Sequence, residues 1–353
     1  MTAETLLFFV AVLQGGSIVV LIAVLLANRW LRRRRRDRVA PRRMVLDEAI
    51  KGWALGDVGP ELVVRGLEAL PRSDAVEALL AWSVRLTGER WRALADALER
   101  RPWTTRLRKA VRSRTWWRRL EAARFLSVAG TAADAGDIER LLKDPHPAVR
   151  ITIAVALERF ATPRLVNIVL DRLPDMVGPV QAHYAAVLRG QNAVTVPLLT
   201  ERLGLVYDLG LPRIVEFSGR LGDARLREPI TALATHRDAE VRVQVARALG
   251  DYPHARTVTV LQTLCTDSAW EVRALAVRSL GRIGDAATLA DLRSRLADAE
   301  WWVRLRAALA LTRLGAAGRD ALLKAETGAQ PDARYVSRLI LGLSPQALSE
   351  FAA

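Results

Sequence analysis

The sequence predicts an all-α protein in which one N-terminal transmembrane helix is followed by an α-solenoid of repeated helix pairs. Three observations support this fold class. Of the 353 residues, 51% are hydrophobic but only 6% are aromatic, and the abundance of alanine, leucine, valine and arginine is typical of helical proteins. An uncharged run near the N-terminus has the length of a membrane span. After residue 110, a residue pattern recurs about every 31 positions.

The first element is an uncharged stretch of 22 residues from Leu6 to Ala27. At about 1.5 Å per residue, a helix of this length crosses the roughly 30 Å hydrocarbon layer of a bilayer once. A cleaved signal peptide would begin with basic residues and end at a small-residue cleavage site, whereas this chain has Glu4 before the apolar run and arginines after it. We therefore expect residues 1–28 to be a transmembrane anchor.

The second element is a polybasic juxtamembrane linker, residues 29–43, which carries nine arginines and only one acid, Asp37. Because basic residues that flank a span stay in the cytoplasm, the linker predicts a single-pass protein of the inner (cytoplasmic) membrane. Its N-terminus is expected outside and its solenoid in the cytoplasm of a bacterial cell. Positive charge beside a membrane also attracts anionic lipid headgroups, at about 1 kcal/mol per basic residue. We expect such lipids near Arg32 to Arg43.

Residues 44–110 predict about four short helices that follow the repeat pattern poorly. Helix breakers divide the segment at Gly56 to Pro60, at Pro71, at Gly88 and at Pro102. We interpret the segment as degenerate helical repeats that cap the solenoid beside the membrane. At the opposite end, residues 330–353 are expected to form a capping helix around Ala333 to Leu341.

Residues 111–329 repeat one pattern, in which an anchor residue is usually followed by a small residue four positions later and by leucine or phenylalanine seven positions later. These offsets place both side chains on one helical face, where neighbouring helices pack. An aspartate six positions before most anchors is expected to accept hydrogen bonds at a helix N-terminus. Each unit predicts two antiparallel helices, such as residues 257–267 and 268–285, with Gly281 and Gly284 as candidate C-caps. The anchors are Arg118, Arg150, Gln181, Ile214, Arg242, Arg273 and Arg304.

At these positions the sequence resembles the HEAT repeats, and more closely their short bacterial form named after phycobilisome lyases. The resemblance rests on DPHPAVRITIAVALERF, DAEVRVQVARALG, DSAWEVRALAVRSLGRIGD and DAEWWVRLRAALALTRLG, and it covers roughly residues 115–315. It implies a structural ladder in which aspartate and arginine link adjacent units, formed here by Asp144, Arg150, Arg242, Asp267, Arg273, Asp298 and Arg304. Gln181 and Ile214 replace the arginine in the third and fourth units, where the ladder should break.

Residues 100–119 combine nine cations with tryptophans and contain no acidic residue. Such a surface suits a protein partner, phosphates or lipid headgroups, because cationic side chains bind anions and indole rings stack or insert into a membrane interface. Alternatively, the cations form a solvated face and the tryptophans pack between layers. The candidate basic patch is Arg100, Arg101, Trp103, Arg106, Arg108, Lys109, Arg112, Arg114, Trp116, Arg118 and Arg119.

A candidate aromatic edge consists of Trp270, Trp301 and Trp302, which stand just before the anchors of two consecutive units. These tryptophans either pack between repeats or form a strip that binds a partner. Because adjacent residues of a helix cannot both point inward, we expect Trp301 or Trp302 to be exposed.

The sequence contains no motif that predicts catalysis. Phosphate-binding glycine loops, nucleophile elbows and Cys/His arrangements are absent, so we predict no catalytic, cofactor-binding or metal-binding residue. The single cysteine, Cys265, and four scattered histidines lack the spacing of metal ligands.

These observations predict a membrane-tethered cytoplasmic scaffold or adaptor whose solenoid binds a protein partner. The partner is expected to be membrane-associated, for example a membrane enzyme or a transporter such as an envelope polysaccharide synthase. Two alternatives stay open. One is binding of anionic lipid, or less expectedly of nucleic acid, through the basic patches. The other is an enzyme of lyase or glycosylase type.

Overall fold

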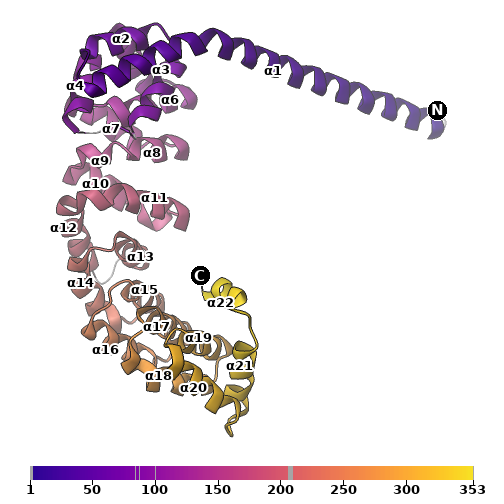
Figure 1. Ribbon diagram of the computed structural model, residues 1–353, viewed down its shortest axis with the longest axis vertical. Helices are drawn as coiled ribbons and strands as arrows, with labels where there is room; N and C mark the ends of the chain where they lie inside the picture. Colours follow the sequence, from indigo (N-terminus) through magenta and orange to yellow (C-terminus); the bar gives the residue numbers. More distant parts are fainter. Residues whose placement is uncertain (1–2, 84, 87, 100, 206–209, 353) are drawn as a thin grey trace. The chain divides into compact units, whose positions relative to one another are not determined.

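The computed structural model describes residues 3–83, 85–86, 88–99, 101–205 and 210–352, with some side chains of the first and last helices left out. Within these ranges the chain forms α-helices and short 3₁₀ turns, and no β-strand occurs (Figure 1). The all-α prediction is thus confirmed. The chain divides into two compact units, residues 1–153 and 154–353.

The first unit contains seven helices and most of an eighth. They are α1 (Ala3–Leu55), α2 (Pro60–Glu68), α3 (Arg72–Ser83), α4 (Gly88–Glu99), α5 (Pro102–Lys109), α6 (Trp116–Ala129), α7 (Ala135–Leu142) and α8 (Pro147–Ala154). Prolines begin α2, α5 and α8, where a missing amide hydrogen costs no helical hydrogen bond. The core of this unit holds Leu46, Trp53 and Trp91, each at most 6% exposed.

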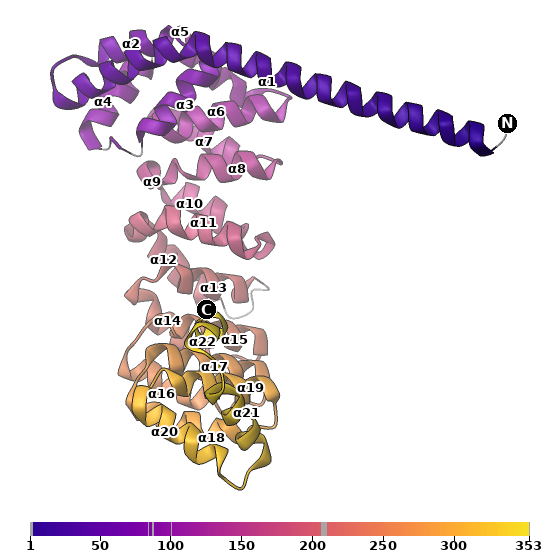
Figure 2. The ribbon, with the colours of Figure 1, turned by 45° about the vertical axis from the view of Figure 1, so that its right-hand side comes forward.

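Only the C-terminal part of α1 packs against the other helices of its unit, and the N-terminal part extends away from them (Figure 2). Of the apolar side chains on that part, Val20, Leu21 and Leu25 are 58–63% exposed. No described helix is long and apolar enough to span a membrane. However, most side chains between Leu6 and Ala27, on which the predicted anchor depends, lie outside the described residues.

The second unit is built from two layers of helices (Figure 1). We call them the odd layer and the even layer, after the numbers of the helices in each. The odd layer stacks α11, α13, α15, α17 and α19, and the even layer contains α10, α12, α14, α16, α18 and α20. This arrangement confirms the predicted α-solenoid. The bounds are α9 (Leu157–Phe160), α10 (Pro163–Leu170), α11 (Gly178–Leu188), α12 (Asn192–Leu203), α13 (Leu211–Leu221), α14 (Arg227–Ala232), α15 (Ala239–Leu249), α16 (Ala255–Leu264), α17 (Trp270–Ile283), α18 (Leu289–Ser294), α19 (Trp301–Thr312), α20 (Gly315–Glu326), α21 (Pro331–Leu341) and α22 (Pro345–Ala352).

The repeat pattern supplies the core between these layers. Ala246, Val277 and Ala308 are fully buried, as are Leu249 and Leu280 three positions after the first two. Small residues at the first position let the odd-layer helices approach closely, and the leucines fill the space behind them. The units therefore stack because none of them can bury its apolar face alone.

The two glycines at the end of α17 have different roles. Gly284 caps the helix with a left-handed φ of 72°, and its amide donates to the Leu280 carbonyl. Gly281 lies inside the helix, where an added Cβ would come within 2.7 Å of the Ala310 Cα on α19. The prediction of Gly281 as a C-cap is therefore wrong, because this glycine permits close packing of two helices instead.

The C-terminal segment forms two helices rather than one. Helix α21 packs against α19 and α20, and Val336 and Ile340 on its inner face are buried. After Ser344 the chain forms α22, which contacts α19. The sequence did not predict this last helix, because its eight residues carry too little pattern.

Candidate functional site

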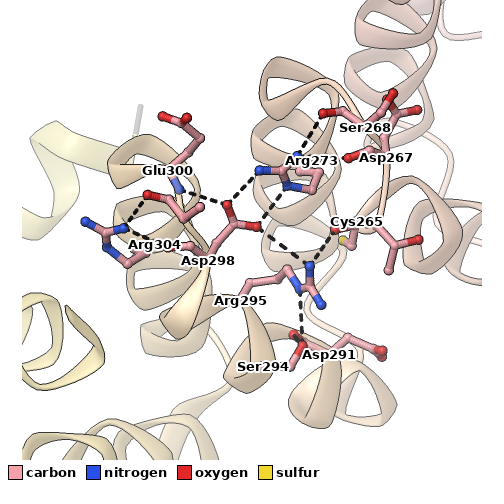
Figure 3. A network of polar contacts seen from close by, with 12 residues as sticks. Cys265, Asp267, Ser268, Arg273, Asp291, Ser294, Arg295, Asp298, Glu300 and Arg304 are labelled. Atoms are coloured by element: carbon pink, nitrogen blue, oxygen red, sulfur yellow. Dashed lines mark hydrogen bonds and ion pairs between the residues drawn. The ribbon is translucent and has the colours of Figure 1, made fainter. Parts of the chain in front are cut away.

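Arginine–aspartate pairs link consecutive repeats of the second unit (Figure 3). Arg242 donates from Nε and Nη2 to the Asp267 carboxylate at 2.7 and 2.8 Å. Arg273 binds Asp298 in the same way, at 2.9 and 2.8 Å. Both carboxylates lie 25 positions after their arginines, so each pair joins an odd-layer helix to the turn that starts the next one. Such two-point pairing fixes geometry as well as charge.

The remaining guanidinium nitrogen of each ladder arginine binds its own repeat. Nη1 of Arg273 donates to the carbonyls of Asp267 and Ser268, at 2.9 and 3.2 Å. The carboxylate of Asp298 also accepts from the Glu300 amide at 3.0 Å, in the turn that leads into α19 (Figure 3). One aspartate therefore fixes the turn before its own helix and holds the preceding repeat.

This pairing keeps the ladder carboxylates ionised. Burial alone would raise the pKa of Asp298, but hydrogen bonds from Arg273 and from the Glu300 amide outweigh it and hold that pKa below its usual value. At Asp267 the hydrogen bond from Arg242 is the largest effect, and it lowers the pKa in the same direction.

The first unit contains the same arrangement one position later than the sequence pattern suggested. Arg119, not the predicted anchor Arg118, donates from Nη2 to Asp144 at 3.0 Å, and its Nη1 reaches the Ser113 carbonyl six positions earlier. Arg118 is exposed. The repeat pattern could not separate two adjacent arginines, and the helix begins so that the second one faces the next turn. A further pair joins Arg108 to Asp134, at 2.6 and 3.1 Å.

The other anchors depart from this geometry. Arg150 donates to the carbonyls of Asp144 and Pro145. Arg304 donates to the Asp298 and Ala299 carbonyls, with Asp332 3.5 Å away. Gln181 and Ile214, which replace arginine, are both buried.

Within the irregular fourth unit, the structure reveals a charged cluster on α13 that the sequence did not predict. Glu216 on α13 is 6% exposed and accepts from Arg213 and Arg220, at 2.8 and 3.0 Å. Burial would raise its pKa, but these two arginines hold it below the usual value. The three side chains are spaced three and four positions apart, and this spacing could have indicated the cluster.

The basic patch of residues 100–119 is only partly a free surface. Arg108 and Arg119 bind buried carboxylates, Arg101 pairs with Glu61, and Arg112 lies 3.4 Å from Asp137. Arg106, Lys109, Arg114 and Arg118 are exposed, whereas Arg100 lies outside the described residues. A surface cavity of about 680 Å³ beside the patch is lined by cations and acids together, including Arg140, Lys143 and Glu139.

Its tryptophans divide in the same way. Trp103 packs edge-on against Phe125 with ring centres 5.8 Å apart. Trp116 stacks on His146 at 4.0 Å and is 40% exposed. Trp117, which the candidate patch omitted, is 58% exposed.

The tryptophans of the predicted aromatic edge face different neighbours. Trp270 and Trp301 are half-buried, and the Trp301 ring lies 5.8 Å from that of Tyr335 on α21. Trp302 is 53% exposed and faces α22 instead. Trp301 and Trp302, which are adjacent on α19, therefore face different helices, α21 and α22.

Trp302 lines a groove of about 300 Å³, which we call the arginine groove. Arginines from the odd layer surround it, and apolar side chains of α19 and α22 complete it. Burial lowers the pKa of Arg306, and the positive charges of Arg278 and Arg247 lower it further. The lining residues are Arg278, Trp302, Leu305, Arg306, Leu309, Ala310, Arg313 and Phe351.

A protein-family model described as HEAT repeats matches residues 226–312 and 259–340. Residues 226–340 are thus similar to HEAT repeats. No curated protein sequence is significantly similar to the chain. Several solved structures are similar to the chain. An engineered protein is 20% identical over 81% of this chain and 89% of its own, with a TM-score of 0.30. The Escherichia coli protein YibA is 16% identical over 73% of this chain and 99% of its own (TM-score 0.37), and human deoxyhypusine hydroxylase in complex with glycerol is 16% identical over 79% of this chain and 96% of its own (TM-score 0.30).

Within the HEAT repeats, the ladder and the arginine groove use different positions of the same helices. Arg273 and Arg304 occupy the repeated position: Arg273 binds the Asp298 carboxylate of the next repeat, and Arg304 binds a carbonyl of its own repeat. Arg278 and Arg306 lie at other positions of α17 and α19 and border the groove. Sequence reasoning missed the groove because its three arginines stand at different offsets from the anchors of their repeats. The absence of any acidic residue from α19 was the available signal.

Proposed function

We propose that this chain is a membrane-tethered scaffold whose HEAT-repeat solenoid binds a protein partner and catalyses no reaction. The observation that carries the proposal is the exposed indole of Trp302 in an arginine-lined groove. Tryptophan and arginine are the residues that most often dominate protein–protein binding energy. Ladder arginines stabilise the fold, whereas the groove arginines border a surface that a partner can reach.

The sequence of α1 supports the proposed membrane tether. The uncharged residues from Leu6 to Ala27 are long enough to cross a bilayer, and the arginines after them favour the cytoplasmic side. Exposed side chains such as Leu21, Leu25 and Leu26 would be removed from water by such an environment. We therefore propose an inner-membrane location with the solenoid in the cytoplasm.

A second candidate function is binding of anionic lipid by the first unit. The observation that favours it is the exposure of Trp117 close in sequence to the exposed cations Arg114 and Arg118. An indole and two guanidinium groups suit the headgroup layer of an anionic membrane. Arg32 to Arg43 would add to this attraction.

The scaffold proposal is tested by crosslinking the tagged full-length chain in the membranes of its own organism and identifying the captured molecules by mass spectrometry. Recovery of one membrane protein in an amount comparable to the chain is expected. Recovery of lipid or nucleic acid without such a protein would contradict it. A salt series distinguishes the cases, because binding to nucleic acid weakens steeply with ionic strength.

The tether is tested by cysteine labelling of intact cells. Burial raises the pKa of the Cys265 thiol to about 12, so the native cysteine should contribute little background. Thr2→Cys is expected to react with a membrane-impermeant maleimide from outside. Ala316→Cys, at an exposed position of α20, should react only after the membrane is opened. Equal labelling of both sites in intact cells would contradict the orientation.

A further inference from the structure

The arginine groove has an apolar floor and a cationic border. Leu305 and Leu309 are half-buried and Ala310 is 4% exposed, so these side chains of α19 form the floor. Trp302 is 53% exposed beside them. Arg278 reaches the groove from α17, while Arg306 and Arg313 come from α19 and the turn after it.

The charge of this surface is positive and concentrated. The lining of the groove includes Arg278, Arg306 and Arg313 and no acidic residue. Burial and the nearby charges of Arg278 and Arg247 both disfavour the protonated form of Arg306. An anionic group in the groove would offset this repulsion, because opposite charges stabilise each other most where water is partly excluded.

The chain's own C-terminal helix indicates what kind of molecule fits. Phe351 of α22 lines the groove, and the preceding residue, Glu350, is acidic and exposed. A short helix with an aromatic side chain next to a carboxylate therefore already lies at this site. Phe351 remains 61% exposed, so α22 covers the groove only partly.

We infer that the arginine groove is the docking site for an acidic amphipathic helix of the partner protein, which takes the place of α22. Its apolar side chains would pack against Trp302 and the floor of α19, while its carboxylates lie among the arginines. This inference rests on the proposed scaffold function and names the chemistry of the partner. A nucleic acid would satisfy the arginines but would leave Leu305 and Leu309 without apolar contacts, so a helix with both kinds of side chain fits better.

The inference is tested by fluorescence anisotropy with the full-length chain in detergent micelles. The probe is a labelled helical peptide of about 15 residues, with leucines at positions i, i+3, i+4 and i+7 and glutamates on the other face. A matched peptide carries glutamine in place of every glutamate. We expect the acidic peptide to bind at least about tenfold more tightly than the neutral one, and single-stranded DNA not to displace it. Equal affinity of the two peptides, or displacement by DNA, would overturn the inference.

Two single substitutions should act in opposite directions. Trp302→Ala is expected to weaken peptide binding about tenfold, because a large apolar contact is lost. Phe351→Ala is expected to tighten binding, because it loosens the helix that occupies the groove. Leu323→Ala, at a 44% exposed position of α20 in the even layer, serves as the control and should change nothing. Damage to the fold would weaken binding in both groove variants, so weaker binding of Phe351→Ala refutes displacement of α22.

Charge is tested separately from shape. Arg306→Gln should weaken binding of the acidic peptide and leave the neutral peptide unaffected, whereas the exposed Arg319→Gln should affect neither. A loss that is the same for both peptides would contradict the electrostatic part of the inference. If a crosslinked protein partner persists with Trp302→Ala and Arg306→Gln, the scaffold function stands and the groove assignment fails. If no protein partner is captured at all, the scaffold function itself fails.

Discussion

Arg273 and Asp298 are 25 positions apart and meet through two hydrogen bonds of 2.9 and 2.8 Å. Arg242 and Asp267 meet at the same spacing one repeat earlier, and Arg119 and Asp144 in the first unit. A single arginine thus holds the carbonyls of its own repeat and the helix N-terminus of the next. This contact couples neighbouring repeats, none of which can bury its apolar face alone.

Removing one partner of the ladder should cost more than removing an exposed acid. Asp298→Ala leaves the half-buried Arg273 guanidinium without its carboxylate and the turn before α19 without its hydrogen bond to the Glu300 amide, so a loss of about 3 kcal/mol in the free energy of unfolding is expected. Asp320→Ala, on the exposed face of α20, should change this free energy by less than about 0.5 kcal/mol. Equilibrium denaturation followed by circular dichroism measures both. Equal effects would refute the ladder as a stabilising device.

The ladder also predicts a pH dependence. The pKa of Asp298 is lowered in the folded chain from its ordinary value of 3.8, so its stabilising contribution is complete above that value and is lost as pH falls through the lower, folded-state pKa. Asp267 follows the same course. Thermal unfolding midpoints measured downward from pH 5 should therefore fall, and Asp298→Asn should reduce the fall. An unchanged profile in that variant would exclude the carboxylate as a source of the acid sensitivity.

Charge reversal should divide the basic patch into structural and surface residues. Arg108→Glu would face Asp134, which is 5% exposed, and is expected to cost about 3 kcal/mol or more of folding free energy. Arg114→Glu, at an exposed position, should change stability by less than about 0.5 kcal/mol. If lipid binding belongs to this surface, Arg114→Glu should nevertheless reduce sedimentation with vesicles that contain phosphatidylglycerol. Similar stability of the two variants would contradict the division.

The contact between α17 and α19 predicts the effect of one methyl group. Gly281→Ala would place Cβ within 2.7 Å of the Ala310 Cα, so the helices must separate at a cost of about 1–3 kcal/mol. Gly136→Ala is the matched control, because an added Cβ on α7 meets nothing within 4 Å. That variant should be neutral or stabilise the chain by up to about 1 kcal/mol. Urea denaturation separates the two outcomes, and a neutral Gly281→Ala would disprove the close approach.

The repeat itself could be predicted from sequence because its signal is periodic. Leu249, Leu280 and Leu311 recur every 31 positions and are all fully buried, as a stacked core requires. The identity of the ladder arginine in the first unit could not be predicted, since Arg118 and Arg119 are adjacent and only the start of α6 decides which one faces Asp144. Which arginine joins the ladder thus depends on where its helix begins, and the local sequence does not fix that boundary.

The candidate binding surface was less accessible to sequence reasoning. Trp302 was predicted as part of an aromatic edge, but its neighbours in space are Arg278 from another helix and Phe351 from the unpredicted α22. Contacts of this kind arise from stacking and from the path of the C-terminal segment. Conversely, Arg108 looked like part of a free cationic surface, although Asp134, 26 positions later, binds it. Charge counted along the chain does not distinguish exposed cations from paired ones.

The measurement that tests the scaffold account most directly is photocrosslinking in living cells from both helix layers. A photoreactive phenylalanine analogue replaces Trp302 or Arg278 in the odd layer and, as controls, Leu323 or Arg319 in the even layer. If the solenoid binds its partner at the arginine groove, both odd-layer positions should give adducts with the same protein and the even-layer positions none. Adducts of equal yield from both layers, or adducts with lipid or nucleic acid alone, would contradict it.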